Sequence, residues 1–297
     1  MLKQLRLQDQ VWLLLMLPPL FWAGNAIMGR AVAGEVPPVG LAFWRWTLGA
    51  LIVLPFAWKH LHADAGTLRH HWRVVLALSV LGIGIFNTFV YIGLNSTSAL
   101  NAVMIQSGIP PLIVLMTFLM FRDRITPLQG IGIALSLVGA MTLISKGEFG
   151  ALARMELNSG DLWVFAAVVC YAGYTALMRQ RPPVHPFSFL FVTFALGAMV
   201  ILPFYLNETW SDRPFVPTPT AIAATAYVVL FPSILAYLCY NRSVALIGPN
   251  RTGLSIHLVP VFGSIAAILF LGETLHLFHV AGIALIAAGI ALATRRR

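Results

Sequence analysis

The sequence predicts an all-α membrane protein with ten transmembrane helices, arranged as two inverted five-helix repeats around a central cavity. Two observations carry this prediction. Hydrophobic residues make up 59% of the 297 residues and charged residues only 10%, so most apolar side chains must face something other than water. In addition, short stretches of the first half of the chain recur in the second half in the same order.

Ten apolar stretches are long enough to cross a bilayer, whose hydrocarbon core of roughly 30 Å requires about 20 helical residues. Because lipid cannot satisfy backbone amides, each stretch is expected to be a helix. The expected spans are residues 10–32, 38–58, 72–94, 98–120, 125–145, 160–179, 185–206, 218–241, 249–271 and 276–294.

The first stretch has an alternative interpretation as a cleaved signal peptide. Lys3 and Arg6 precede it, and residues 31–33 read Ala-Val-Ala, a pattern typical of a signal-peptidase site. Against this, the apolar run from Val11 to Met28 is longer than a usual signal core, and a matching helix recurs in the second half. We therefore expect a retained helix.

The loop charges predict the orientation. When loops are assigned alternately to the two sides, fourteen of the nineteen Lys and Arg residues fall on one side and four on the other, with Arg45 inside a span. The positive-inside rule then places both termini in the cytoplasm of a prokaryotic cell, with the chain crossing the plasma (inner) membrane many times.

Composition also argues against several partners. The net charge of +9 is spread over short loops and forms no patch, so no nucleic-acid partner is expected. Cys170 and Cys239 lie inside predicted spans without metal-ligand spacing, and the histidines show no such pattern either. We expect no metal and no cofactor; the expected partners are the lipid bilayer and a small-molecule solute, and the choice between monomer and homodimer stays open.

The internal repeat divides the chain into residues 1–146, a connecting loop at 147–159, and residues 160–297. LGALIVLPF at 48–56 recurs as LGAMVILPF at 196–204, with six identities in nine positions. GIALSLVG at 132–139 recurs as GIALIAAG at 282–289, with five identities in eight. Because each half contains five spans, the second must enter the membrane from the opposite side, so the repeats are inverted.

Inverted repeats favour a transporter. Two halves that exchange conformations create one state open to each side, with the solute site at their interface near the midplane. A duplication that only stabilised a scaffold would leave the same trace in the sequence.

The chain resembles the drug/metabolite transporter superfamily, and its EamA-type branch in particular. The resemblance rests on the ten spans, the five-plus-five duplication, Arg45 within Phe43-Trp44-Arg45, Gly272-Glu273 after span nine, and the G-x6-G pairs. It implies a basket-like bundle whose cavity is lined by spans one, three, four, six, eight and nine, with five and ten at the periphery. Members export amino acids, nucleotide-related metabolites or drugs.

One departure from the superfamily concerns ion coupling. The small four-span relatives carry a glutamate in their first span, but residues 13–28 of this chain contain no acid. A carboxylate proton relay of that kind is therefore not expected, and both facilitated diffusion and another form of coupling stay open.

Polar side chains inside the spans are the first candidates for the cavity, because each must find a partner in hydrocarbon. Interhelical hydrogen bonds would supply partners as readily as a solute would. His257 additionally allows a proton-linked role, against the alternative of a satisfied core histidine. These candidates are Asn25, Asn87, Asn101, Gln106 and His257.

Aromatic residues with polar tips form a second group, and most are matched between the repeats. Such side chains make a cavity that is apolar in bulk and selective at a few points, although interfacial belts would explain some of them, Trp163 above all. The group comprises Trp22, Tyr91, Trp163, Tyr171, Tyr174, Tyr237 and Tyr240.

Arg45 lies roughly 10 Å from the outer end of span two, at 1.5 Å per residue. It could attract a substrate carboxylate, or it could be a structural cation that bonds helix-end carbonyls or extends outward to the interface. Because span two is peripheral in the family that the chain resembles, we favour the structural role.

Proline and glycine carry mechanical signals. Proline removes a backbone hydrogen bond and bends a helix, so prolines in cavity-lining spans are either hinges or static bends. The expected breaks are at Pro110 and Pro111, Pro232, and Pro260, with Pro18 and Pro19 interrupting span one. The seven-residue spacings of Gly132 with Gly139 and of Gly282 with Gly289 predict close helix packing in spans five and ten.

Together these features predict an exporter of small amphipathic metabolites, with amino acids, including aromatic ones, as the first choice, working by alternating access. A broad-specificity drug efflux protein is the nearest alternative. An intramembrane enzyme is not expected, because Ser255 and His257 point in different directions and no other catalytic pair is evident. A channel would need a continuous polar stripe, which the spans lack.

Overall fold

The computed structural model describes residues 7–32, 34–148, 150, 158–211, 213–271 and 274–294. Every regular element in this part of the chain is a helix, and the helices form ten segments that correspond to the ten predicted spans. Eight of them are long and apolar enough to cross a membrane, and α1 contains a shorter apolar stretch, Val11–Asn25. The predicted fold class is confirmed.

The first five segments run from α1 to α7. Their bounds are α1 Leu7–Ala31; α2 Pro38–His70; α3 Trp72–Leu78, η1 Ser79–Ile85 and α4 Phe86–Leu94; α5 Ala99–Gln106 and α6 Ile109–Phe121; and α7 Pro127–Ile144. The second five follow with the same plan. Their bounds are α9 Ser159–Leu177 with η2 Met178–Gln180; α10 Pro186–Trp210; α11 Pro219–Val229, η3 Leu230–Leu235 and α12 Ala236–Ile247; α13 Pro249–Gly253, η4 Leu254–His257 and α14 Leu258–Leu271; and α15 Leu277–Thr294.

Local sequence explains where several helices begin. Thr126 and Gln129 form a reciprocal capping box at the start of α7, and Asn158 and Asp161 form another at the start of α9. The helix of span two continues to His70, well beyond the expected end of the span at residue 58. The apolar stretch ends near residue 58 because polar residues follow it, but residues 59–70 contain no proline that would end the helix. The predicted loop 147–159 and the Gly272-Glu273 motif lie largely or wholly outside the described residues.

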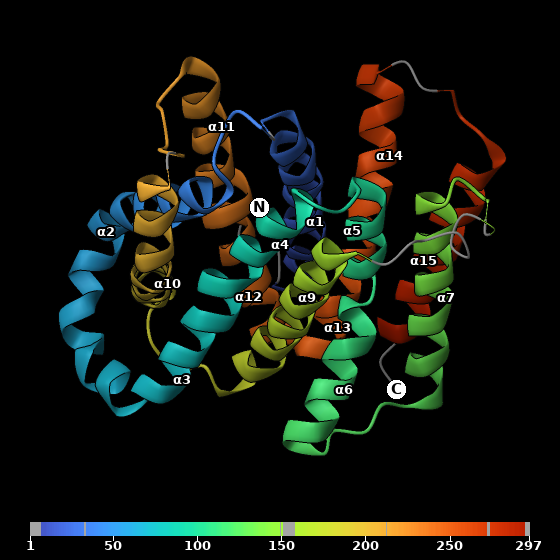
Figure 1. The fold of residues 1–297 in the computed structure, drawn as a ribbon. Coiled ribbons are helices and arrows are strands. Elements are labelled where there is room, and N and C mark those ends of the chain that lie inside the picture. Colours follow the sequence, from blue (N-terminus) through green and yellow to red (C-terminus); the bar gives the residue numbers. More distant parts are fainter. Residues whose placement is uncertain are drawn as a thin grey trace, which may run out of the picture.

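Two peripheral helix pairs flank the bundle (Figure 1). At one edge α7 packs along α15, and at the opposite edge α2 packs along α10. A Cβ atom on Gly132 would lie 2.5 Å from the carbonyl oxygen of Gly289, and one on Gly139 would lie 2.7 Å from that of Gly282. The predicted close approach of spans five and ten is therefore confirmed.

The remaining six segments form the centre of the bundle. In one half of these contacts, α9 packs against α4 and α6. In the other half, the equivalent helix α1 packs against α12 and α14, which are the equivalents of α4 and α6. Each of these contacts joins the two halves of the chain and has its counterpart in the other repeat. The core therefore lies on the interface between the repeats, where the sequence predicts the solute site.

The break in span four precedes its prolines. α5 ends at Gln106, and α6 begins at Ile109 with Pro110 and Pro111 in its first turn. A proline in the first turn is tolerated because its missing N–H would have no partner there, whereas its ring would clash with the carbonyl four residues earlier in a continuous helix. Span nine behaves alike, with the short 3₁₀ segment η4 ahead of Pro260.

Spans three and eight contain π-helical turns at matched positions, η1 and η3. Pro232 lies inside η3, where the Ser233 hydroxyl donates to the carbonyl of Val228 at 2.6 Å. This carbonyl lies four residues before Pro232, which has no N–H to donate to it. By contrast, Pro18 and Pro19 do not interrupt span one, since α1 is continuous across both.

Candidate functional site

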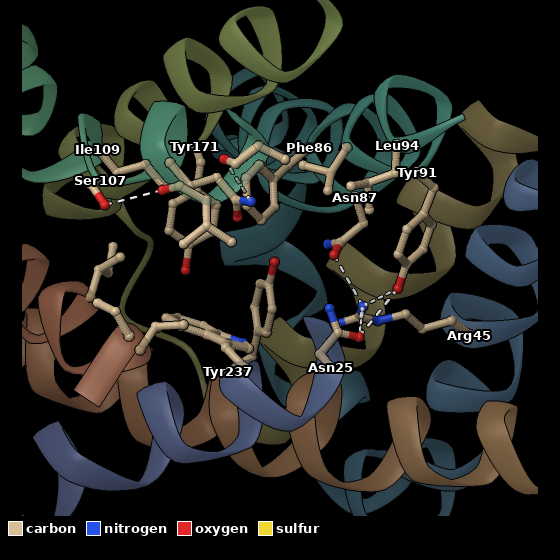
Figure 2. A pocket seen from close by; sticks show the side chains of 18 residues that line it. Asn25, Arg45, Phe86, Asn87, Tyr91, Leu94, Ser107, Ile109, Tyr171 and Tyr237 are labelled. Atoms are coloured by element: carbon tan, nitrogen blue, oxygen red, sulfur yellow. Dashed lines mark hydrogen bonds between the residues drawn. The ribbon is translucent and has the colours of Figure 1, made fainter. Parts of the chain in front are cut away.

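A cavity lies at the interface of the two repeats, in the half of the bundle that contains the turn between α4 and α5 (Figure 2). All six spans expected to line it contribute side chains, and span two contributes one more. The empty space, including its mouth, measures about 1140 Å³. The residues of the sequence prediction that line it are Trp22, Asn25, Arg45, Asn87, Tyr91, Gln106, Tyr171, Tyr237 and Pro260.

One end of the cavity is polar and is centred on Arg45. Its side chain is only 1% exposed, and its Nη1 donates to the Asn25 and Asn87 side-chain oxygens and the Tyr91 hydroxyl at 3.0 to 3.2 Å. Nε donates to the Ser233 hydroxyl at 2.6 Å. Figure 2 shows Asn25, Asn87 and Tyr91 gathered around Arg45 on one side of the cavity. The burial excludes a side chain that extends outward to the interface, whereas the bond to the Pro232 carbonyl agrees with the other form of the expected structural role, a cation that bonds backbone carbonyls.

The π-helical turn of span eight makes this position possible. Within η3 the carbonyl of Pro232 accepts from Arg45 Nη2 at 3.1 Å and from the indole N–H of Trp22 at 3.2 Å. In an uninterrupted α-helix that carbonyl would bond within its own backbone. The π-helical turn therefore leaves the Pro232 carbonyl free, in the middle of the span, to accept from Arg45. This arginine comes from α2, which the family resemblance placed at the periphery.

The other end of the cavity is aromatic. The ring of Tyr171 lies 4.4 Å from that of Phe86 and 5.9 Å from that of Trp22, edge to face in the latter case. Tyr237 stands 6.4 Å from Trp22, and its hydroxyl donates to the Gly82 carbonyl at 2.6 Å. The Tyr171 hydroxyl makes no well-aligned hydrogen bond to any other described residue. The cavity is therefore amphipathic, with a cation at one end and ring faces at the other.

Tyr174 and Tyr240 were expected in the cavity but lie behind its wall. Both are buried, with the Tyr174 hydroxyl donating to Asn241 Oδ1 at 2.7 Å and the Tyr240 hydroxyl 3.1 Å from that of Thr175. Their rings pack against Tyr237 and Tyr171 respectively. They form a layer between this cavity and a second one at the opposite end of the bundle.

Three further candidates are also outside the cavity lining. Asn101 turns its amide to Asp161 at 3.4 Å, near the turn between α4 and α5. Trp163 is 41% exposed and packs edge-on against Phe89, so its position fits an interfacial aromatic residue. His257 lies behind the wall, and both of its ring nitrogens are hydrogen-bonded.

The histidine occupies the break in span nine and bridges to the break in span four. Its Nε2 lies 3.0 Å from the Ser107 carbonyl, and its Nδ1 lies 2.8 Å from the Ser136 hydroxyl. A carbonyl only accepts, so Nε2 carries the proton. Ser107 precedes Pro111 by four residues, so the proline leaves this carbonyl free for the histidine. His257 therefore joins the two broken helices and α7.

Sequence reasoning missed several lining residues, Phe86 and Ser107 among them. A helical projection through Asn87 and Tyr91 would have pointed to Val90 and Leu94, which share their face and also line the cavity. Phe86 lies about 100° around the helix from Asn87, so that projection gives no signal for it. Ser233 had no such signal, because its role depends on the π-helical turn.

A second cavity opens at the other end of the bundle, near η2 and the turn between α12 and α13. Arg179, Arg181 and Arg242 line it, and Asp123 forms an ion pair with Arg179. Desolvation lowers the pKa of the Arg181 guanidinium, although an arginine keeps its proton in proteins. This vestibule lies on the side where the loop charges predict the cytoplasm.

A helical membrane bundle of two inverted repeats, with an amphipathic cavity between them, has the architecture of a secondary transporter. The EamA-like transporter family model matches residues 11–145 and again residues 158–295. The chain therefore belongs to the EamA-like transporter family, and its duplication is confirmed.

Similar proteins span nearly the whole chain. The YyaM protein of Bacillus subtilis (strain 168), described as an uncharacterized transporter, is 26% identical over 96% of this chain and 93% of its own length. The inner membrane protein YtfF of Escherichia coli (strain K12) is 25% identical over 95% of this chain and 94% of its own. One crystal structure with 20% identity has a TM-score of 0.76 over 96% of both chains, which shows the same fold.

Proposed function

We propose that this membrane transporter moves small amphipathic metabolites, amino acids and aromatic ones among them, by alternating access. The observation that carries the proposal is the cavity at the repeat interface, with a buried cation at one end and aromatic rings at the other. A solute with a carboxylate and an apolar body matches both ends. Export as the direction of flux comes from the family resemblance.

The alternative of a broad drug efflux protein receives less support. Many such solutes are cations, and the cavity lining contains an arginine and no acid. A cationic solute would gain only the ring faces there. The prediction that both termini face the cytoplasm of a prokaryotic cell also belongs to the proposal, as do the repeat boundaries at residues 146 and 160.

The test is uptake of labelled amino acids into liposomes that contain the purified protein. We expect saturable uptake of phenylalanine in protein-containing liposomes and none in empty ones. Val103→Trp, which places a large ring in the cavity, should abolish it. Val138→Trp is the matched control, because Val138 is exposed on α7 and lies outside the cavity lining.

Two results would refute the proposal. One is the absence of saturable flux for any amino acid or other small amphipathic solute. The other is equal flux in Val103→Trp and wild type, provided that both elute as single symmetrical peaks in gel filtration. Broad transport of unrelated drugs would instead favour the alternative.

A further inference from the structure

The guanidinium of Arg45 lacks a counter-charge. Its hydrogen-bond acceptors are neutral hydroxyl, amide and carbonyl oxygens, and its Cζ stands 4.6 Å from the centroid of the Trp46 ring. Among the described residues, no carboxylate oxygen lies within 4.0 Å of it. Taking an unpaired charge out of water is costly unless another charge compensates it.

The polar end also holds donors that the protein does not use. A guanidinium has five N–H groups, two of them on Nη2, and among the described residues Nη2 donates only to the Pro232 carbonyl. The Asn87 side chain is 4% exposed, and its Nδ2 makes no well-aligned hydrogen bond to any described residue, the Tyr237 hydroxyl being the neighbouring polar group. Figure 2 shows this amide turned into the cavity beside the guanidinium. The guanidinium and the Asn87 amide are hydrogen-bonded neighbours, and the donors that remain on each suit the oxygens of a carboxylate.

The fold itself does not demand a cation at this position. In the alignment of residues 48–56 with 196–204, Arg45 corresponds to Thr193 of the second repeat. Thr193 is buried and bonds only backbone carbonyls of its own helix, so the same helix position is stable without charge. The charge is thus a feature of one repeat and one end of the cavity.

The cavity offers no carboxylate to a substrate cation. Its lining contains no Asp or Glu. Asp161 accepts from Thr97 and Asn101, and Glu208 accepts from the backbone N–H groups of Val39 and Gly40. In an α-amino acid the ammonium and the carboxylate share one carbon. A carboxylate held at Arg45 would therefore bring the ammonium close to the guanidinium, and like charges repel.

We propose that the cavity takes monoanionic aromatic carboxylates, and that it binds them in preference to zwitterionic amino acids with the same ring. The inference rests on the proposed function, because it assumes that the transported solute occupies this cavity. The second cavity has the same sign of charge. Arg181 and Arg242 line it, and neither has a carboxylate within 4.0 Å among the described residues. Anions are therefore attracted at both ends of the path.

Three ligands that share one ring and differ in charge test this inference on the full-length wild-type protein. They are 3-phenylpropionate, an anion near pH 7; phenylalanine, a zwitterion; and phenethylamine, a cation. Each is measured for uptake into liposomes and for binding by calorimetry in detergent. We expect 3-phenylpropionate to bind at least roughly tenfold more tightly than phenylalanine, and phenethylamine to bind most weakly.

Variants at Arg45 assign the preference to the guanidinium. Arg45→Gln keeps hydrogen-bonding groups and removes the charge, so the difference between the three ligands should collapse. Arg45→Lys keeps the charge and should keep the order. Arg213→Gln, in the loop before α11, is the control and should match wild type. If Arg45→Gln does not fold, the wild-type ligand series still decides whether the cavity prefers the anion.

The outcomes separate the two proposals. Equal or tighter binding of phenylalanine than of 3-phenylpropionate overturns the anion preference but leaves the proposed function intact. Transport of 3-phenylpropionate without transport of phenylalanine supports the anion preference and narrows the proposed function. Binding of none of the three overturns the anion preference, whereas the proposed function is refuted only if the liposomes also take up no other amino acid or small amphipathic solute. Retention of the full preference in Arg45→Gln overturns the role of Arg45.

Discussion

Removing the hydroxyl of Tyr174 should open the bundle toward its basic end. This residue lies in the layer between the two cavities, and its hydroxyl donates to Asn241 Oδ1 at 2.7 Å. Asn241 lines the second cavity, whereas Tyr237, which packs on Tyr174, lines the first. Both partners of the bond are buried, at 1% and 4% exposure. Tyr174→Phe would leave a buried acceptor unpaired.

The magnitude follows from the burial. An unsatisfied buried acceptor costs about 1–3 kcal/mol. Asn241 is only 4% exposed although it lines the second cavity, and separation of the layer would let water reach its Oδ1 and supply the missing bond, so this cost applies only while the layer is closed. A bias of about 1–3 kcal/mol shifts a two-state equilibrium by roughly 5- to 150-fold. We therefore expect at least about a fivefold rise in the open population.

Thiol labelling measures this population. Both native cysteines, Cys170 and Cys239, are replaced by serine, and Leu190→Cys is introduced because Leu190 is buried yet lines the second cavity. The rate of reaction with a membrane-impermeant maleimide should rise at least about fivefold in Tyr174→Phe. An unchanged rate would refute the assignment of this layer as a closed gate.

A matched control removes a tyrosine hydroxyl elsewhere. Tyr205 is half-buried on α10, and its ring stacks on Phe43 with centroids 4.4 Å apart, without a hydrogen bond from its hydroxyl. Tyr205→Phe should leave the labelling rate at the wild-type value. A rise of the same size in this variant would show that the effect is general loosening.

Two further predictions concern stability. Gly132→Ala should destabilise the α7–α15 pair by about 1–3 kcal/mol, because the new methyl would lie 2.5 Å from the Gly289 carbonyl oxygen. Its melting temperature in detergent should fall by several degrees, whereas Gly130→Ala, whose methyl would meet its nearest atom at 3.6 Å, should melt like wild type. The second concerns His185, at the start of α10, whose pKa is lowered by desolvation and by His60 stacked at 3.6 Å. Because the folded state binds the proton less readily than the unfolded state, the free energy of unfolding should fall as pH drops from about 6.5 through the lowered pKa. His185→Asn retains a side chain that can cap the helix and should flatten this part of the pH–stability curve. Equal slopes in the variant and the wild type would contradict this prediction.

The features that were predictable from sequence depend on hydropathy and on local spacing. The spans follow from apolar length, and the close contact of spans five and ten follows from glycines seven residues apart. Both are properties of a helix taken alone or of a repeated pattern. The breaks in spans four and nine were predictable to within a few residues, because proline determines which backbone bonds are lost but not which neighbouring residue ends the helix.

Which way a polar side chain faces was not predictable. Asn87 and Asn101 look alike in the sequence, yet Asn87 lines the cavity at the guanidinium and Asn101 turns to Asp161. Both lipid and neighbouring helices favour apolar side chains, so a membrane helix is apolar on every side. The periodicity of its sequence therefore does not distinguish the lipid-facing side from the side that faces the cavity. The spans that line the cavity were therefore easier to predict than the individual residues that face it.

The sequence by itself determined the architecture, since the hydrophobic length, the duplication and the odd number of spans per half depend only on composition and order. The tertiary structure decided the chemistry of the cavity. Arg45 enters it only because a π-helical turn around Pro232, nearly two hundred residues away in the chain, offers a free carbonyl and a hydroxyl at the right depth. Such an arrangement depends on how two distant helices pack, and no single segment encodes it.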